Sequence, residues 1–140
     1  MSGFCIEDLF VGQAAEITRT VTAADLDAFA AVTGDDNPLH LDEAFAAGTP
    51  FKGRIAHGML GAAYISAAIG ARLPVPGAVY LSQTLRFRRP VRIGAAVTAR
   101  VEIAALDLAR ARATLTTVCK VGGKVAIEGE AQVSVPRRDG

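Results

Sequence analysis

The sequence GMLGAAYISAAIGARL, residues 58–73, is the longest apolar run of the chain. Apolar residues fall on nearly every side of the helix that this run predicts, which is the pattern of a helix buried on all sides. Many of its positions are glycine or alanine, so the helix is thin and strands can wrap closely around it. The run ends at Leu73-Pro74-Val75-Pro76-Gly77, and no stretch reaches the roughly 18 apolar residues of a membrane span.

Alternation of polar and apolar residues predicts strands on both sides of this helix. One strand is expected before it, over residues 15–21, and four are expected after it, over 79–88, 96–103, 110–121 and 124–135. Gly122-Gly123 predicts a hairpin, and a change of phase near Thr117 predicts a β-bulge. Gln83 falls on the apolar side of its strand and needs a hydrogen-bond partner if it is buried. One antiparallel sheet packed around one helix is an α+β fold.

Three segments between the first strand and the long helix have their own signals. Thr22-Ala23-Ala24-Asp25 resembles a capping box that starts a helix, and Gly34 is a natural stop for it. Residues 35–41 are irregular by composition. Residues 42–47 predict a short helix that ends at Gly48.

Length and composition predict one domain and exclude several partners. The chain has 140 residues, of which 51% are hydrophobic, so part of the apolar surface is expected to be buried against another subunit. A formal charge of +1 gives no nucleic-acid footprint. The two cysteines, Cys5 and Cys119, have no metal or redox spacing, and we expect free thiols. The N-terminus lacks a signal-peptide pattern, so we expect a cytoplasmic protein.

The segment Thr33-Gly34-Asp35-Asp36-Asn37-Pro38-Leu39-His40 carries the candidate chemistry. It places a carboxylate and an imidazole five positions apart on a segment that Pro38 stiffens, and a catalytic pair needs such pre-positioning. The second segment, Ile55-Ala56-His57-Gly58-Met59-Leu60, leads into the long helix. A carboxylate, an imidazole and a helix N-terminus together suit the addition or removal of water next to a carbonyl.

With these motifs, the sequence resembles the MaoC-like hydratase/dehydratase family, and most closely the small (R)-specific enoyl-CoA hydratases that supply monomers for polyhydroxyalkanoate synthesis. The resemblance rests on Gly34-Asp35-x-Asn37-Pro38-Leu39-His40, on the helix entry at residues 55–59 and on Leu85-x-Phe87-x-x-Pro90-Val91. It implies a single hot-dog domain over residues 1–140, with a core of about 10–135, in which a curved antiparallel sheet wraps a long central helix. Ala95 stands where many relatives have an acidic residue, a difference that touches no catalytic position.

The resemblance also implies a lyase reaction, the reversible syn addition of water to a trans-2-enoyl-CoA to give an (R)-3-hydroxyacyl-CoA. By the motif match, Asp35 and His40 are the catalytic pair, and the Gly58 N–H holds the thioester oxygen. Ser66 lies in the region that lines the acyl pocket in relatives, and Asn37 supports the loop. The coenzyme A thioester is the substrate, no metal or other cofactor is expected, and the family implies a homodimer.

Each of these residues also has a purely structural interpretation. Asp35 can be an ordinary turn residue, and His40 a histidine bonded to the backbone. His57, the other histidine, is expected at the helix entry in a structural role, where it can orient the loop. Ser66 and Tyr64 can be packing residues. The arginines at 86, 88 and 89 can be the solvated face of a strand or a binding site for coenzyme A phosphates, a role for which Lys52 and Arg54 compete.

Three other functions fit the same fold. A dehydratase acting on acyl carrier protein would use the same active-site chemistry. A hot-dog thioesterase usually carries its carboxylate on or near the central helix, and residues 58–73 contain no Asp or Glu. An acyl-CoA-binding domain without catalysis would not need Asp35 and His40 together. The preferred acyl chain length does not follow from the sequence.

Overall fold

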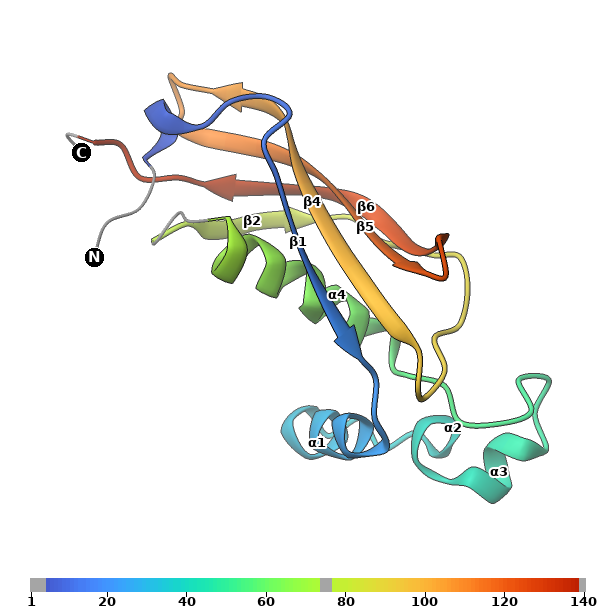
Figure 1. The fold of residues 1–140 in the computed structure, drawn as a ribbon. Helices are drawn as coiled ribbons and strands as arrows, with labels where there is room; N and C mark the ends of the chain where they lie inside the picture. The colour runs from blue at the N-terminus through green and yellow to red at the C-terminus, as the bar shows by residue number, and fades with distance from the viewer. Residues whose placement is uncertain (1–4, 74–76, 139–140) are drawn as a thin grey trace.

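The computed structural model describes residues 5–73 and 77–138, which form one antiparallel sheet with a helix along one face (Figure 1). The strands are β1 (Ala14–Thr20), β2 (Val79–Gln83), β3 (Arg86–Phe87), β4 (Ala96–Asp107), β5 (Arg112–Val121) and β6 (Lys124–Ser134). Their order across the sheet is β1-β4-β5-β6-β2, and β3 also pairs with β6. The predicted α+β class is therefore correct. The predicted helix stop at residues 73–77 lies mostly outside the described residues.

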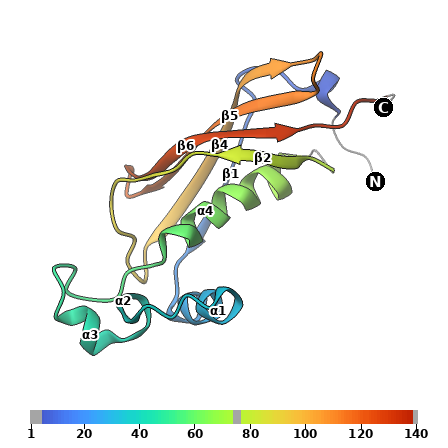
Figure 2. The same ribbon diagram turned by 180° about the vertical axis from the view of Figure 1, so that it is seen from behind.

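The long apolar run forms α4 (Gly58–Ala67) and continues into η2 (Ala68–Arg72), a π-helical segment. Figures 1 and 2 show α4 lying along one face of the curved sheet. Both helical segments contribute to the core beneath the sheet, α4 through Ile65 and η2 through Ala68 and Ile69. The prediction of burial on all sides is wrong for the single chain, because the sheet covers one side only and Met59 is 56% exposed on another.

Three short helices, α1 (Ala23–Thr33), α2 (Pro38–Leu41) and α3 (Glu43–Ala47), gather at one end of the sheet, away from both termini (Figure 2). The predicted capping box is confirmed at α1, where the Asp25 N–H donates to Thr22 Oγ1 and the Thr22 N–H donates to Asp25 Oδ2. The predicted short helix is confirmed as α3. The expectation of an irregular segment over 35–41 is wrong in part, because Asn37 caps a short helix at its N-terminus.

Two features of the predicted sheet differ in the structure. The strand expected over 79–88 is divided into β2 and β3, with a register shift between Tyr80 and Ser82. No change of phase occurs at Thr117, because alternate burial continues through β5 and the register shift lies between Cys119 and Lys120. Thr117 can be buried because its hydroxyl oxygen accepts a hydrogen bond from Gln83 Nε2 at 3.0 Å. The hairpin at Gly122-Gly123 is confirmed, with φ values of 58° and 77°.

The backbone passes unusually close to Gly129 of β6. A Cβ at this position would overlap the backbone carbonyl of Thr84. The backbone of Thr84 is itself held in place, because its N–H donates to the Glu130 carbonyl at 2.9 Å. We expect Gly129→Ala to lower the free energy of unfolding by about 1–3 kcal/mol, because backbone cannot give way as a flexible side chain does. Urea denaturation of this variant, with Gly70→Ala as control, measures the effect; Gly70 has no atom within 4 Å of an added Cβ. Equal midpoints for the two variants would contradict the prediction.

Among the described residues no helix is both long enough and apolar enough to cross a membrane. Cys5 and Cys119 are both free thiols, as predicted, and Cys119 is buried in the core.

Candidate active site

The loop after α1 holds Asp35 in a defined orientation. Gly34 takes a left-handed conformation, with φ of 81°, that turns the chain at the end of the helix. The Thr33 hydroxyl donates to the Phe29 carbonyl at 2.7 Å and accepts from the Asp35 N–H at 3.1 Å. One carboxylate oxygen of Asp35 accepts the Asn37 N–H at 3.4 Å, so Thr33 holds the backbone of Asp35 and Asn37 holds its side chain. The side chain remains exposed.

His40 lies on α2, and its tautomer follows from its hydrogen bond. Asn37 fixes the start of this helix, because its side-chain oxygen accepts the Leu39 N–H at 3.0 Å. His40 Nδ1 lies 2.7 Å from the carbonyl oxygen of Ile55. A carbonyl only accepts, so Nδ1 carries the hydrogen, and Nε2 of the neutral ring presents a lone pair. His40 is therefore prepared to accept a hydrogen bond or a proton at Nε2.

Arg54 holds the backbone of the same residue. Its Nε donates to the His40 carbonyl at 2.7 Å, and its Nη2 forms an ion pair with Asp27 of α1 at 3.3 Å. The side chain of Arg54 is only 13% exposed. This arginine is thus committed to the scaffold of the site and does not favour the coenzyme A phosphate role considered for it.

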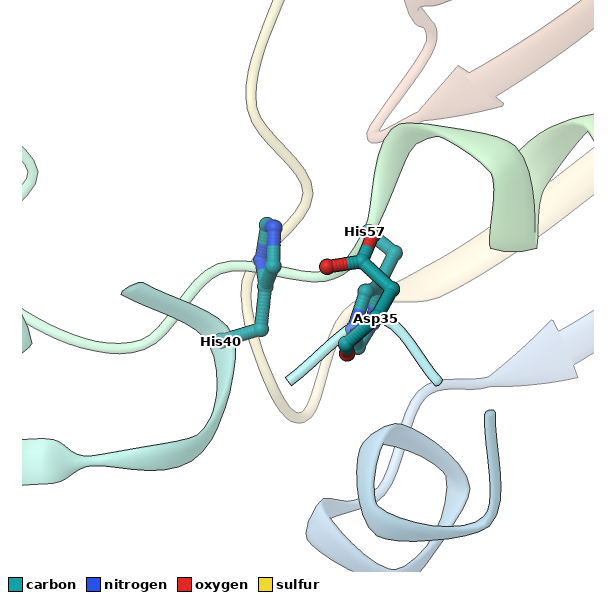
Figure 3. A group of neighbouring side chains, drawn as sticks. All are labelled: Asp35, His40 and His57. Atoms are coloured by element: carbon teal, nitrogen blue, oxygen red, sulfur yellow. The ribbon is translucent and has the colours of Figure 1, made fainter. Parts of the chain in front are cut away.

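His57 lies directly before α4 and brings the two preceding segments together. It is 2% exposed, and its Nε2 lies 3.1 Å from the backbone carbonyl oxygen of Asp35. Its ring stacks on that of His40, with centroids 4.1 Å apart and planes at 29°. In Figure 3 the three side chains converge from three different segments, and a carboxylate oxygen of Asp35 points toward the His40 ring.

One polar atom from each of Asp35, His40 and His57 lies within 4.8 Å of the others, a set that includes the usual ligand types of a transition metal. The stacked rings do not suit chelation, because a metal must lie in the plane of each imidazole at roughly 2 Å from its nitrogen. Near-parallel planes keep the two lone pairs from converging. One nitrogen of each ring is also occupied by a carbonyl. The cluster is better suited to a water molecule than to a metal ion.

Gly58 begins α4 beside this cluster. The first N–H groups of a helix have no partner within it and lie at the positive end of the helix dipole. Gly58 shares with His40 an inner cavity of about 360 Å³ between α4 and the sheet. Other residues that line the inner cavity are Phe51, His57, Tyr64, Phe87 and Arg89. A Cβ on Gly58 would come within 2.8 Å of the Phe87 ring, so the backbone at this position packs closely against another residue of the cavity wall.

Asp35 and Ser66 line a second hollow, an edge groove of about 750 Å³ between α4 and β2. The edge groove is also lined by Met59, Tyr80, Leu81 and Gln83. The predicted polar partner of Gln83 is found here, because its Oε1 accepts from the Tyr80 hydroxyl at 2.8 Å while its Nε2 donates to Thr117. Gln83 therefore supports the wall of this groove.

The structure brings together four of the five predicted site residues in two hollows. His40 and Gly58 line the inner cavity, and Asp35 and Ser66 line the edge groove. Ser66 and Gly58 line different hollows, although they lie two helical turns apart on the same helix. Asn37 braces the loop, as the motif implies. Sequence reasoning placed His57 at the helix entry but missed its contacts with Asp35 and His40.

The arginines near the inner cavity differ in their availability. Arg88 is paired with Glu128 at 2.7 Å, and Arg92 donates to the Phe51 carbonyl at 2.6 Å. Arg89 lines the cavity, and its side chain has no hydrogen bond or ion pair with other described residues, although its backbone N–H donates to the Ala126 carbonyl at 3.3 Å. Of the arginines on this side, Arg89 is the one best placed to meet an anionic ligand.

Comparison with known proteins places the chain in a family. The model of the MaoC like domain matches residues 11–128. The chain belongs to the MaoC-like family. It is 53% identical to a 3-hydroxybutyryl-CoA dehydratase of Methylorubrum extorquens, over 95% of this chain and 85% of the relative. It is 50% identical to an (R)-specific enoyl-CoA hydratase of Rhodospirillum rubrum, over 94% of this chain and 92% of the relative.

Solved structures of MaoC-like relatives agree with the fold. An R-hydratase of Pseudomonas aeruginosa, in its unliganded form, superposes with a TM-score of 0.91 at 46% identity, over 97% of this chain and 88% of that one. The predicted hot-dog fold, an antiparallel sheet around a central helix, is thereby confirmed.

Proposed function

We propose that this MaoC-like protein catalyses the reversible hydration of a trans-2-enoyl-CoA to an (R)-3-hydroxyacyl-CoA. The observation that carries the proposal is the meeting of the Asp35 carboxylate and the His40 imidazole, within 4.8 Å, beside the N-terminus of α4. The names of relatives at 50–53% identity, a hydratase and a dehydratase of acyl-CoA substrates, support the same reaction in its two directions.

The catalytic pair is suited to activate one water molecule. The polar atoms of Asp35 and His40 lie within 4.8 Å of each other, so both can reach a single water oxygen at hydrogen-bond distances of about 2.8 Å. Asp35 acts as the principal base, and the Nε2 lone pair of His40 orients the water. As the water oxygen bonds to the β-carbon, its proton passes to the pair and is relayed to the α-carbon. Addition from one side of the double bond requires both groups on that side.

The backbone N–H of Gly58 stabilises the charge that this attack creates. When water adds to the β-carbon, electron density moves through the α-carbon to the thioester oxygen. A helix N–H aimed at that oxygen stabilises it in the transition state, and such a donor contributes roughly 3–4 kcal/mol in comparable sites. Gly58 and His40 both line the inner cavity, which supports the action of the N–H and the imidazole on the same thioester.

The two hollows suit the two ends of the substrate. The edge groove contains the apolar side chains of Met59 and Leu81 together with Ser66, and it takes the acyl chain. The inner cavity takes the pantetheine arm, and Arg89 meets a phosphate of coenzyme A beyond it. The thioester then lies between Asp35, which lines the edge groove, and His40, which lines the inner cavity. This chemistry also suits the supply of monomers for polyhydroxyalkanoate in the cytoplasm.

A homodimer completes the edge groove. β2 is an edge strand of the sheet and exposes Val79 and Leu81, while α4 exposes Met59 beside it. A second copy paired along β2 would cover these side chains.

Sedimentation of the wild-type protein is expected to give a mass near twice the 14.5 kDa of one chain. The Leu81→Glu variant is expected to sediment with the mass of one chain, because a charge replaces part of the apolar contact. Leu108→Glu, at an exposed leucine in the β4–β5 hairpin, is the control. A wild-type protein with the mass of one chain would contradict the dimer.

The hydratase proposal is tested with crotonyl-CoA and purified protein. Loss of the enoyl-thioester absorbance without release of free thiol is the expected result. The product should be oxidised by an R-specific but not by an S-specific 3-hydroxyacyl-CoA dehydrogenase. Release of thiol would identify a thioesterase instead, and an S product would contradict the assignment. Assays with longer enoyl-CoA substrates and with enoyl groups linked to acyl carrier protein then define the range of substrates that the protein accepts.

A further inference from the structure

Among the described residues, His57 is the one buried polar side chain that touches both members of the catalytic pair. It is 2% exposed, and it contacts the Asp35 backbone through Nε2 and the His40 ring through stacking. Phe29 of α1 lies against the same imidazole, with centroids 4.6 Å apart and planes at 42°. The ring is therefore held between α1 and α2 at the entry of α4.

The hydrogen bond determines the tautomer of His57. The carbonyl of Asp35 accepts only, so Nε2 of His57 carries the hydrogen and donates it. Nδ1 is then unprotonated, and this buried atom has no hydrogen-bond partner within the described residues. His40 has the opposite arrangement, because its Nδ1 donates to Ile55. Two stacked histidines thus have opposite tautomers, each fixed by one backbone carbonyl.

We infer that His57 is a positioning residue for the reaction, an inference that rests on the proposed hydratase function. Its Nε2–H holds the backbone of Asp35, and its ring holds the plane of the His40 imidazole. Because His57 also precedes Gly58 directly, one side chain fixes the base, the water-orienting group and the entry of the helix that supplies the N–H. Displacement of a catalytic group by about 1 Å can cost about 10²-fold in rate.

Three substitutions separate the two contacts of His57. Gln places an amide N–H near the position of Nε2 but has no ring. Phe keeps a flat ring but has no donor. Asn reaches only the position of Nδ1, so it lacks both contacts. Nδ1 of His57 has no hydrogen-bond partner among the described residues. None of the three substitutions therefore breaks a hydrogen bond at that atom.

Steady-state kinetics with crotonyl-CoA, on variants shown to be folded by circular dichroism, test the inference. We expect His57→Asn to lower kcat by about 10²-fold, and His57→Gln and His57→Phe to recover part of the loss. The KM should stay within about threefold of wild type, because the lost contact acts on the catalytic groups and not on substrate binding. The pH profile of His57→Gln should keep the shape of the wild-type profile.

Two kinetic results would overturn the inference. Unchanged kcat per folded molecule in all three variants, with only a lower melting temperature, would show a role in stability alone. Equal loss in all three variants, with one limb of the pH profile missing, would make His57 itself an acid or base of the reaction.

A second measurement does not depend on activity. The chain has two histidines, so long-range ¹H–¹⁵N spectra contain two imidazoles, and the spectrum of His57→Gln assigns them. The expected result is an Nε2–H tautomer for His57 and an Nδ1–H tautomer for His40 at neutral pH. An Nδ1–H tautomer at His57 would contradict the inference even if the protein is a hydratase. If the wild-type protein shows the expected tautomers but is inactive on every enoyl thioester, the result would instead contradict the proposed function.

Discussion

Replacing Asp35 by asparagine is expected to lower kcat for crotonyl-CoA hydration by about 10²–10⁴-fold, the usual contribution of a general base. Asn keeps the size of the side chain, and its amide oxygen can still accept the Asn37 N–H that braces the loop at 3.4 Å. The variant therefore removes the basic group with little change of shape. Stopped assays of enoyl-thioester absorbance over hours measure the residual rate.

Asp36→Asn is the matched control for this experiment. It makes the same change of charge one residue later, at an exposed position of the loop. We expect its kcat to stay close to wild type. His40→Gln, which removes the imidazole opposite Asp35, is expected to lose activity to a similar extent as Asp35→Asn. Near wild-type turnover in both Asp35→Asn and His40→Gln would show that the pair is not catalytic.

Replacing Gly58 by proline is expected to lower kcat/KM by about 10²–10³-fold, because proline removes the N–H that would stabilise the thioester oxygen. The first position of a helix tolerates proline, and His57 has φ of −56° and ψ of 134°, an extended conformation that a following proline accepts. The substitution thus deletes the donor where the backbone can accommodate it.

Gly58→Ala separates loss of the donor from crowding. Both variants bring a Cβ within 2.8 Å of the Phe87 ring, which is on a side chain 54% exposed and free to turn, but only proline lacks the N–H. The expected result is a large difference in kcat/KM between Gly58→Pro and Gly58→Ala. Equal kinetics for the two would show that the Gly58 N–H contributes nothing to the transition state.

Local signals in the sequence were sufficient wherever one segment decides its own structure. The capping box from Thr22 to Asp25, the stop at Gly34 and the hairpin at Gly122-Gly123 all depend on residues within a few positions of one another. The resemblance in the motif at 34–40 likewise identified the family, which the match over residues 11–128 confirms, and the hot-dog fold, which the similarity to the Pseudomonas aeruginosa R-hydratase confirms.

Features that depend on distant segments could not be read in this way. The strand at 79–88 is divided where Thr84 meets Gly129, forty-five positions away, and no pattern within the strand reports that approach. Thr117 predicts a bulge because its polar side chain falls on the apolar side of the strand. In the structure this side chain stays in phase, because Gln83 of another strand donates a hydrogen bond to its hydroxyl oxygen. The contacts of His57 with Asp35 and His40 also join three segments that only the folded chain brings together.

The hydrogen bonds that orient Asp35 and His40 also attach α1 and α2 to the rest of the molecule. His40 is tied to the Ile55 carbonyl, Arg54 joins the His40 backbone to Asp27 of α1, and His57 holds the loop between the two helices. Docking of the small helices and the placement of Asp35 and His40 therefore depend on the same contacts. We expect a substitution in α1 that loosens this docking to lower turnover even where the sheet stays folded, so turnover would report on the packing of helices that lie outside the sheet.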